Sequence, residues 1–432
     1  MTHDAATCTD RPPRHARRAG VVALTAALLA ACASPGSVNP SPGAVRASPT
    51  GAQAPEAGAT GEPATSAPRD RRVGVIVIDV QRSFVSTAER RNPGSNVAAR
   101  VAASQRVLEL VATRQTPLFV TYEAAKTGSG ALAASLASVL PSHAREFIKT
   151  TFAATSQPQL AEALRASGLR RFLVVGAETD VCVLQTILGL RRAGHAVFAL
   201  RDAMFTEEVN VTPALRRMEL AGAALVGMSE AEALVSESEA APEEGIGEPA
   251  LVRPLEIGIV LHDVQGLGAS DPFAAPKRTR LRELLLISEW FRIPLLAADP
   301  ASTLAALPSD LRSIVTRGVQ ALASRPAAIK QLAVAGGHGR IGEAVAALRA
   351  DGTDVFIVED VLLGGSRTEL DPLYAQASDR AGAAAPITYK TLYYELIRSV
   401  NDAEWPSPQW VTASSTYYDL TKGPEELPPL GP

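Results

Sequence analysis

Three residues in the first half of the chain could together carry out nucleophilic catalysis. Asp79, Lys149 and Cys182 each fall at or just beyond the end of a short apolar run. A nearby ammonium and a helix N-terminus lower the pKa of a thiol, and a carboxylate can accept its proton. Backbone N–H groups at a helix start can hold an oxyanion. Taken singly, each residue also has a structural reading: a buried apolar cysteine, a capping aspartate and a solvated lysine.

The elements that must position these residues alternate between strand and helix. Such an alternation predicts βαβ units and a parallel sheet that helices cover on both faces. Ligands of open α/β sheets bind beyond the carboxyl ends of the strands, so the three side chains are expected to converge. We expect strands at 73–79, 117–122, 146–150, 172–176, 196–200 and 223–227, and helices at 96–114, 157–167, 182–193 and 212–221.

A second copy of this pattern follows an acidic linker at 236–254. The segment Ile257-Gly-Ile-Val-Leu-His-Asp263-Val-Gln265 repeats Val73-Gly-Val-Ile-Val-Ile-Asp79-Val-Gln81, and two further matches follow in the same order. Recurrence at matching places along the chain predicts a tandem duplication of one fold. The second copy is shorter, mostly in the region that carries Lys149 in the first.

Three blocks of the first copy resemble the isochorismatase-like cysteine hydrolase superfamily. They are Val75-Ile-Val-Ile-Asp-Val-Gln-Arg-Ser-Phe84, Lys149-Thr-Thr-Phe152-Ala and Gly176-Ala-Glu-Thr-Asp-Val-Cys182-Val. The resemblance extends over residues 73–235. It implies an α/β fold of the Rossmann-like kind, in which a six-stranded parallel sheet forms the middle of a three-layer αβα sandwich.

The resemblance also implies how the residues divide the chemistry. Asp79 would act as base, Lys149 as orienting and charge-stabilising group, and Cys182 as nucleophile. A cis peptide is implied at Ala177–Glu178, with the backbone N–H groups of Glu178 and Cys182 forming the oxyanion hole. The aromatic residues of the matching blocks, Phe84 and Phe152, are expected to line the pocket.

One departure from the family's pattern concerns metals. Nicotinamidases of the family carry Asp-x-His and further histidines after the second strand, where this chain reads Thr121-Tyr-Glu-Ala-Ala-Lys126. The histidines of the chain are scattered, so we expect no metal site and no cofactor. Retention of Cys182 favours hydrolysis of an amide or related C–N bond in a small molecule. Two alternatives remain open: a catalytically inactive binding protein, and a metal-dependent nicotinamidase.

The second copy, residues 255–400, is predicted to be degenerate and non-catalytic. It keeps Asp263, but Arg340 stands where the cysteine would be, and no lysine aligns with Lys149. Its expected role is structural, as one half of an internal pseudo-dimer, and the chain could also form homo-oligomers. Alternatively, His338 and Arg340 could bind an anion at a helix start. The tail, residues 401–432, is expected to pack over one copy.

The N-terminal region is typical of an exported protein. Residues 1–32 have a basic start and an apolar stretch, and they end in Leu29-Ala-Ala-Cys32, which resembles the lipobox of bacterial lipoproteins. Acylation of Cys32 would anchor the chain to a membrane, with the periplasmic side of the outer membrane favoured; an ordinary signal peptide is the alternative. Residues 33–72 read as a disordered Ala/Pro/Gly/Ser tether. A net charge of −3 gives no case for nucleic-acid binding.

Overall fold

The structure is a computed structural model, and it describes residues 72–208, 210–236, 250–267, 274–337, 340–362, 370, 372–374 and 384–397. The predicted export signal with Cys32, the tether, most of the linker, His338 and the tail lie outside the described residues. The chain divides into residues 1–66 and 67–432, and every described residue belongs to the second unit. No helix of the described ranges is both long and apolar enough to cross a bilayer.

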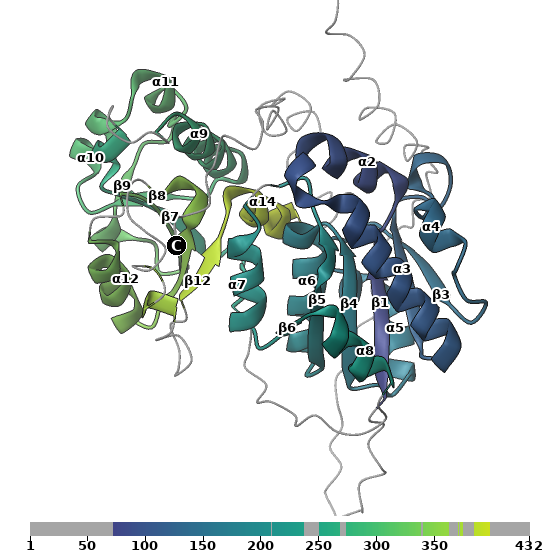
Figure 1. Cartoon of the computed structure of the whole chain (residues 1–432). Helices are drawn as coiled ribbons and strands as arrows, with labels where there is room; N and C mark the ends of the chain where they lie inside the picture. Colours follow the sequence, from purple (N-terminus) through teal and green to yellow (C-terminus); the bar gives the residue numbers. More distant parts are fainter. Residues whose placement is uncertain are drawn as a thin grey trace, which may run out of the picture. The chain divides into compact units, whose positions relative to one another are not determined.

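The first lobe, residues 72–236, is built on a parallel six-stranded sheet with the strand order β3-β2-β1-β4-β5-β6 (Figure 1). Its elements are β1 (Val73–Ile78), α2 (Arg82–Arg91), α3 (Val97–Arg114), β2 (Leu118–Glu123), α4 (Ala134–Ala137), β3 (Arg145–Lys149), α5 (Pro158–Ala166), β4 (Arg171–Ala177), α6 (Leu184–Arg192), β5 (Ala196–Phe205), α7 (Thr212–Leu220), β6 (Ala224–Val226) and α8 (Met228–Ser236).

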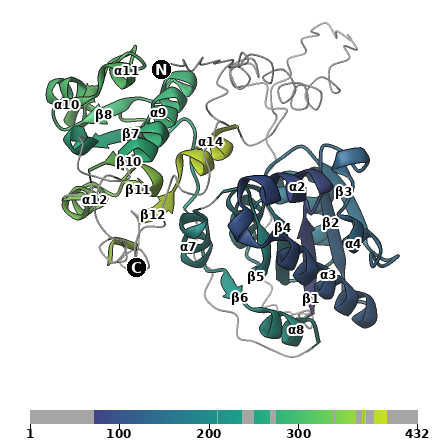
Figure 2. The same cartoon turned by 45° about the horizontal axis from the view of Figure 1, so that its top comes forward.

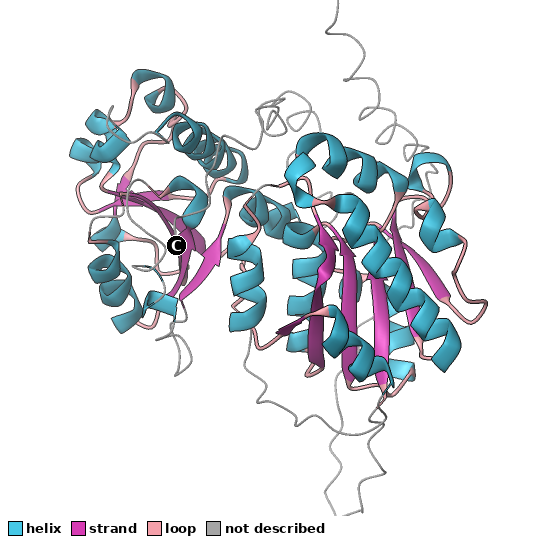
Figure 3. Cartoon of the chain, viewed as in Figure 1, coloured by secondary structure: helices cyan, strands magenta, loops and turns pink. Residues whose placement is uncertain are grey.

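Helices cover both faces of this sheet (Figure 3). Along β1, Val75 and Val77 pack in one core cluster with α3 and α8, whereas Ile76 and Ile78 pack in another with α5 and α6. Burial on both faces is the reason that β1 is a continuous apolar run and shows no alternation. The predicted α/β fold with a six-stranded parallel sheet between two helical layers is confirmed.

The second lobe, residues 250–397, contains another parallel six-stranded sheet (Figure 2). Written β9-β8-β7-β10-β11-β12, its strand order is that of the first lobe, which fits a tandem duplication. Its elements are β7 (Ile257–His262), α9 (Ala274–Phe291), β8 (Leu295–Ala297), α10 (Pro300–Ala306), α11 (Ser309–Arg312), β9 (Gln320–Ala321), β10 (Gln331–Gly336), α12 (Ile341–Ala350), β11 (Asp354–Val358), β12 (Ala384–Ile387) and α14 (Tyr389–Ile397).

The two sheets repeat the same backbone device at the end of their central strands. Ile78 pairs with Gly176 and His262 pairs with Gly336, and both glycines have a φ of 125°. A Cβ at either glycine would lie 2.0 Å from the carbonyl oxygen of its strand partner, so only glycine fits. The aspartate that follows the first strand of each sheet also has a positive φ.

The edge strands of the two sheets differ in length. At equivalent registers Glu146 of β3 pairs with Val120, and Ala321 of β9 pairs with Ala297. Strand β3 then continues to Lys149, whereas β9 ends at Ala321. The second sheet therefore has no strand position equivalent to Lys149.

Candidate active site

The three predicted catalytic residues come from three elements that end at the same edge of the first sheet. Asp79 follows β1 directly, and Lys149 is the last residue of β3. Cys182 lies in a π-helical turn, Thr179–Val183, that joins β4 to α6. The helix predicted to begin at Cys182 thus begins with this wider turn, and the regular α-helix starts at Leu184. Because parallel strands share one carboxyl edge, residues far apart in sequence meet there.

The structure brings these three side chains together. The ammonium Nζ of Lys149 lies 2.6 Å from Oδ2 of Asp79 and 3.4 Å from the sulfur of Cys182. The side chains of Asp79 and Lys149 are fully buried, and Cys182 is 2 % exposed. An acid and a thiol that both contact one ammonium form a set that can activate and stabilise a sulfur nucleophile.

Asp79 is held in place by the neighbouring strand. The Thr121 hydroxyl donates a hydrogen bond of 2.7 Å to Oδ1 of Asp79, which leaves Oδ2 facing Lys149. The backbone of Asp79 has a φ of 46°, an uncommon conformation for a residue with a side chain. Strand β1 therefore ends in a bend that is fixed by both backbone and side chain.

A fourth residue, Glu123, belongs to the site and is missing from the sequence prediction. The Cys182 thiol donates to Oε2 of Glu123 at 3.5 Å, and the same oxygen lies 3.7 Å from Nζ of Lys149. The Glu123 backbone N–H donates to Oε1 of Gln81 at 2.7 Å, which fixes the strand end. The available signal was its position, since Glu123 is an acidic residue at the carboxyl end of β2, next to β1.

Burial dominates the electrostatics of the sulfur. It raises the pKa of the Cys182 thiol well above the ordinary value; the Lys149 ammonium opposes the shift, and the Glu123 and Asp79 carboxylates add to it. The expected lowering by the ammonium is therefore real but smaller than the cost of burying a thiolate. The resting group is a thiol, so attack on a substrate requires a proton acceptor at the site.

The neighbouring groups are shifted as well. Burial raises the pKa of Glu123, with Lys149 opposing and Asp79 reinforcing the shift. Burial alone would lower the pKa of the Lys149 ammonium, but Asp79, Cys182 and Glu123 together raise it, so that it stays charged. Among Asp79, Glu123, Lys149 and Cys182, only Glu123 is partly open to solvent: 22 % of its side chain is exposed.

The turn that carries Cys182 begins at a cis peptide bond between Ala177 and Glu178. The Glu178 carbonyl oxygen accepts hydrogen bonds of 3.1 Å from the N–H groups of both Val181 and Val183. These two bonds close the π-helical turn around the cysteine. Glu178 and Cys182 are the residues expected to form the oxyanion hole. Glu178 immediately precedes this turn, and Cys182 lies within it.

The two aromatic residues expected to line the pocket have different surroundings. Phe152 is buried, and its ring centroid lies 4.7 Å from that of Tyr394 in an edge-to-face contact. Phe84 is half-buried and packs against the cluster formed by α3 and the outer face of β1. Phe152 therefore contacts a residue of the second lobe, whereas Phe84 packs within the first.

The corresponding edge of the second sheet is built differently. Asp263 is exposed there, whereas Asp79 is fully buried. Arg340 is the residue before α12; its side chain is 80 % exposed, and its guanidinium pairs with Glu343 at 2.8 Å. An anion binding at this helix start, as in the predicted alternative, would have to compete with the Glu343 carboxylate for Arg340.

Asp79, Glu123 and Cys182 could in principle also bind a metal ion, since one ligand atom from each lies within 4.8 Å of the others. Nζ of Lys149 lies 2.6, 3.7 and 3.4 Å from these three groups. A cation bound there would have to displace a buried ammonium of the same charge sign. The donor set therefore fits Lys149 better than it fits a metal.

No curated protein matches the chain. Solved structures that match include the MAR1 ribonuclease of Caenorhabditis elegans, with 24 % identity over 39 % of this chain and 83 % of that one (TM-score 0.34). The YcaC gene product of Escherichia coli, described as an octameric hydrolase of unknown specificity, has 22 % identity over 40 % and 84 % (TM-score 0.34). N-carbamoylsarcosine amidase of Thermoplasma acidophilum has 14 % identity over 36 % and 96 % (TM-score 0.31).

The family comparison falls on the lobe that holds the site. Residues 73–230 match the family model described as an isochorismatase domain. This range contains all four residues of the buried cluster and the cis peptide. The first lobe is therefore similar to the isochorismatase domain over nearly its whole length.

Proposed function

We propose that the first lobe is a metal-independent cysteine hydrolase that cleaves an amide or related C–N bond in a small molecule. The observation that carries the proposal is the buried contact of Lys149 with both Asp79 and the Cys182 sulfur. A thiol supplies the nucleophile, and an ammonium beside it stabilises the negative charge that develops on attack. The isochorismatase domain match over the same residues supports this reading.

In the proposed reaction the Cys182 sulfur attacks the substrate carbonyl carbon while the thiol proton passes to Asp79. The backbone N–H groups of Glu178 and Cys182 hold the oxyanion of the adduct. When the C–N bond breaks, the amine leaves with the proton returned by Asp79, and a thioester remains. Water then attacks the thioester, with Asp79 again as base, and releases the acid and the thiol. Glu123 accepts a hydrogen bond from the resting thiol and thereby orients it.

Two measurements test the proposal. Iodoacetamide should label Cys182 stoichiometrically in the full chain, and Asp79→Asn, which lacks the proposed base, should turn over substrate far more slowly. On a panel of small amides, ureides and carbamoyl compounds, Cys182→Ala should abolish any turnover found. A Cys182→Ala chain that keeps the full activity on such a substrate would overturn the proposal.

A second candidate is a binding protein that uses this fold without catalysis, because a fold alone does not imply an activity. The observation that favours it is the burial of Cys182, which is 2 % exposed and whose thiol pKa is raised by that burial. A Cys182 that resists alkylation, together with saturable binding but no turnover on the panel, would decide for this candidate. The metal-dependent nicotinamidase would regain support only if purified protein carried stoichiometric zinc or iron.

We also propose that the chain is anchored to a membrane through acylated Cys32. The support is the sequence Leu29-Ala-Ala-Cys32 after a basic start and an apolar stretch. Two or more acyl chains make a stable anchor. When the full chain is expressed in a Gram-negative host with radiolabelled palmitate, it should take up the label, whereas Cys32→Ser should not. Equal labelling of the two chains, or no labelling of either, would contradict the anchor.

A further inference from the structure

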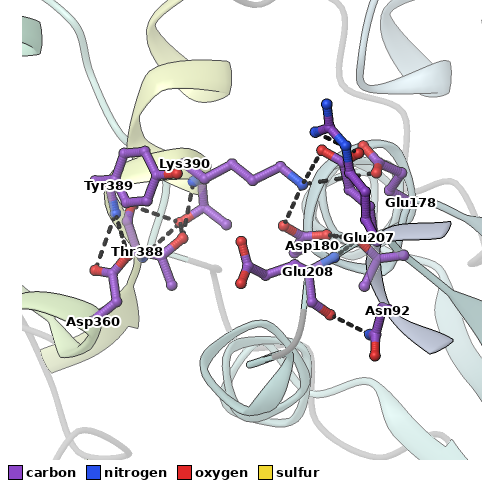
Figure 4. A network of polar contacts seen from close by, with 12 residues as sticks. Asn92, Glu178, Asp180, Glu207, Glu208, Asp360, Thr388, Tyr389 and Lys390 are labelled. Atoms are coloured by element: carbon purple, nitrogen blue, oxygen red, sulfur yellow. Dashed lines mark hydrogen bonds and ion pairs between the residues drawn. The ribbon is translucent and has the colours of Figure 1, made fainter. Parts of the chain in front are cut away.

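A lysine of the second lobe reaches the turn that carries Cys182. Lys390 lies in the first turn of α14, and its ammonium is 3.2 Å from Oδ2 of Asp180, 3.7 Å from Oε1 of Glu178 and 3.8 Å from Oε1 of Glu207 (Figure 4). The Lys390 side chain is 3 % exposed. Asp180 lies within the π-helical turn and Glu178 immediately precedes it. A single ammonium thus contacts both carboxylates of the cysteine turn.

The start of α14 holds Lys390 in this position. The Thr388 hydroxyl accepts from the N–H of Thr391 at 3.1 Å, and the Thr391 hydroxyl accepts from the N–H of Thr388 at 2.8 Å. Such reciprocal bonds fix the first turn of a helix. The N–H of Tyr389 donates to the Asp360 carboxylate at 3.2 Å. The backbone on both sides of Lys390 is therefore held before its side chain meets the first lobe.

Two of the three carboxylates around Lys390 also have other partners. The Thr206 hydroxyl donates to Oδ1 of Asp180 at 2.6 Å, and Arg91 lies 3.0 Å from Oε2 of Glu207. No ion pair of Glu178 other than that with Lys390 is present among the described residues. The titratable and charged groups facing this cluster are Glu123, Glu178, Asp180, Cys182, Glu207, Glu208 and Arg91 from the first lobe, and Arg280, Asp360 and Tyr389 from the second.

We propose that Lys390 is a positioning residue for the Cys182 turn, so that the second lobe completes the active site of the first. This inference rests on the proposed role of Cys182 as a nucleophile. When Glu178 is ionised, three carboxylates lie within about 4 Å of the Lys390 ammonium. Without the ammonium they would repel one another in a buried place, and Glu178 would keep its proton to higher pH or the turn that bears the sulfur would rearrange.

The electrostatic link to the sulfur runs through Glu178. Burial raises the pKa of Glu178 to about 8, Lys390 opposes that shift, and Glu207 and Asp180 add to it. The ionised Glu178 carboxylate in turn raises the pKa of the Cys182 thiol. Ionisation of Glu178 near pH 8 should therefore appear as a bend in the pH profile of Cys182 reactivity. Loss of Lys390 should move that bend to higher pH.

The test compares full-length wild type with Lys390→Met and Lys390→Arg. Iodoacetamide alkylation of the Cys182 peptide is followed by mass spectrometry between pH 6 and pH 10. We expect the bend to move upward by about one pH unit or more in Lys390→Met and to stay near its wild-type position in Lys390→Arg. Lys390→Gln, which keeps a polar end on a similar stem, replaces the Met variant if that chain does not fold.

A matched control separates the charge of Lys390 from the docking of the two lobes. Arg217 of α7 pairs with Glu395 of α14 in a buried ion pair, and Nη2 of Arg217 donates to Oε2 of Glu395 at 2.9 Å. Glu395→Gln should weaken this contact between lobes and lower the melting temperature without moving the bend. If Glu395→Gln moves the bend as far as Lys390→Met does, the effect belongs to lobe docking and the inference fails.

Two further outcomes are decisive. A Lys390→Met chain whose profile overlays that of wild type would overturn the positioning role while leaving the proposed function intact. A wild-type chain whose Cys182 resists iodoacetamide at every pH would overturn the proposed function, and this inference with it.

Discussion

Glu123 and Lys149 are register partners on adjacent parallel strands, each the last residue of its strand, and their charged ends lie 3.7 Å apart beside the Cys182 sulfur. The length of the edge strand β3 therefore decides whether the site exists. Where β9 stops after Ala321, the second sheet has no position for the lysine. The two lobes share a strand order, but only the first extends its edge strand far enough to complete a cluster.

The buried pair of Asp79 and Lys149 predicts a strong dependence of stability on both partners. Replacing Lys149 with Met leaves Asp79 as a buried carboxylate without its ammonium, which costs about 3–5 kcal/mol. The double variant Asp79→Asn, Lys149→Met should cost less than the sum of the single variants, because neither charge is then left alone. Urea unfolding of the three variants measures the coupling. Additive costs would show that the pair contributes no mutual stabilisation.

Glu123→Gln should separate reactivity from turnover. The Glu123 carboxylate raises the pKa of the Cys182 thiol, so its removal should lower that pKa and speed alkylation at pH 7. Turnover should nevertheless fall, since the thiol loses the carboxylate that orients it. Glu146→Gln is the matched control, because this carboxylate lies on the adjacent strand β3 and pairs with Lys126 at 3.0 Å. Equal alkylation rates in wild type and Glu123→Gln at every pH would contradict the assignment.

The raised pKa of Cys182 predicts that alkylation keeps accelerating above pH 9, where an ordinary thiol has already levelled off. The same shift affects stability. The folded state favours the neutral thiol, so the contribution is complete below the unfolded pKa and is lost as pH rises through the folded one. Between neutral and alkaline pH, the free energy of unfolding should therefore fall less in Cys182→Ala than in wild type. Urea midpoints at pH 7 and pH 10 provide the comparison.

Gly176 and Gly336 predict equivalent defects in the two lobes. Alanine at either position would place Cβ 2.0 Å from the partner strand's carbonyl oxygen, in a backbone with a φ of 125°. We expect each substitution to lower the free energy of unfolding by at least about 1–3 kcal/mol. Gly94→Ala is the control, since nothing lies within 4 Å of a Cβ there. Differential scanning calorimetry of the three variants measures their melting temperatures. A Gly336→Ala chain that melts like wild type would argue that the two glycines do not have the same structural role.

The α/β fold, the order of its elements and the meeting of Asp79, Lys149 and Cys182 could all be predicted from local sequence. Apolar runs that end in polar residues indicate buried strands, and parallel strands bring their carboxyl ends to one edge. Glu123 could also be recognised locally, as an acid at the end of a predicted strand. Such an acid is a site candidate only once its strand is known to lie beside β1, which carries Asp79. The repeated segment around Asp263 likewise indicated a second sheet before its strand order was seen.

Tertiary structure decided the remainder. Lys390 stands in the other lobe, and no spacing in the sequence links an ammonium on α14 to the carboxylates of Glu178 and Asp180. The sequence also could not predict whether the pKa of the Cys182 thiol is raised or lowered, because the nearby ammonium lowers it while burial raises it. Burial is a property of everything that packs around the sulfur, so its magnitude emerges only when all the elements are in place.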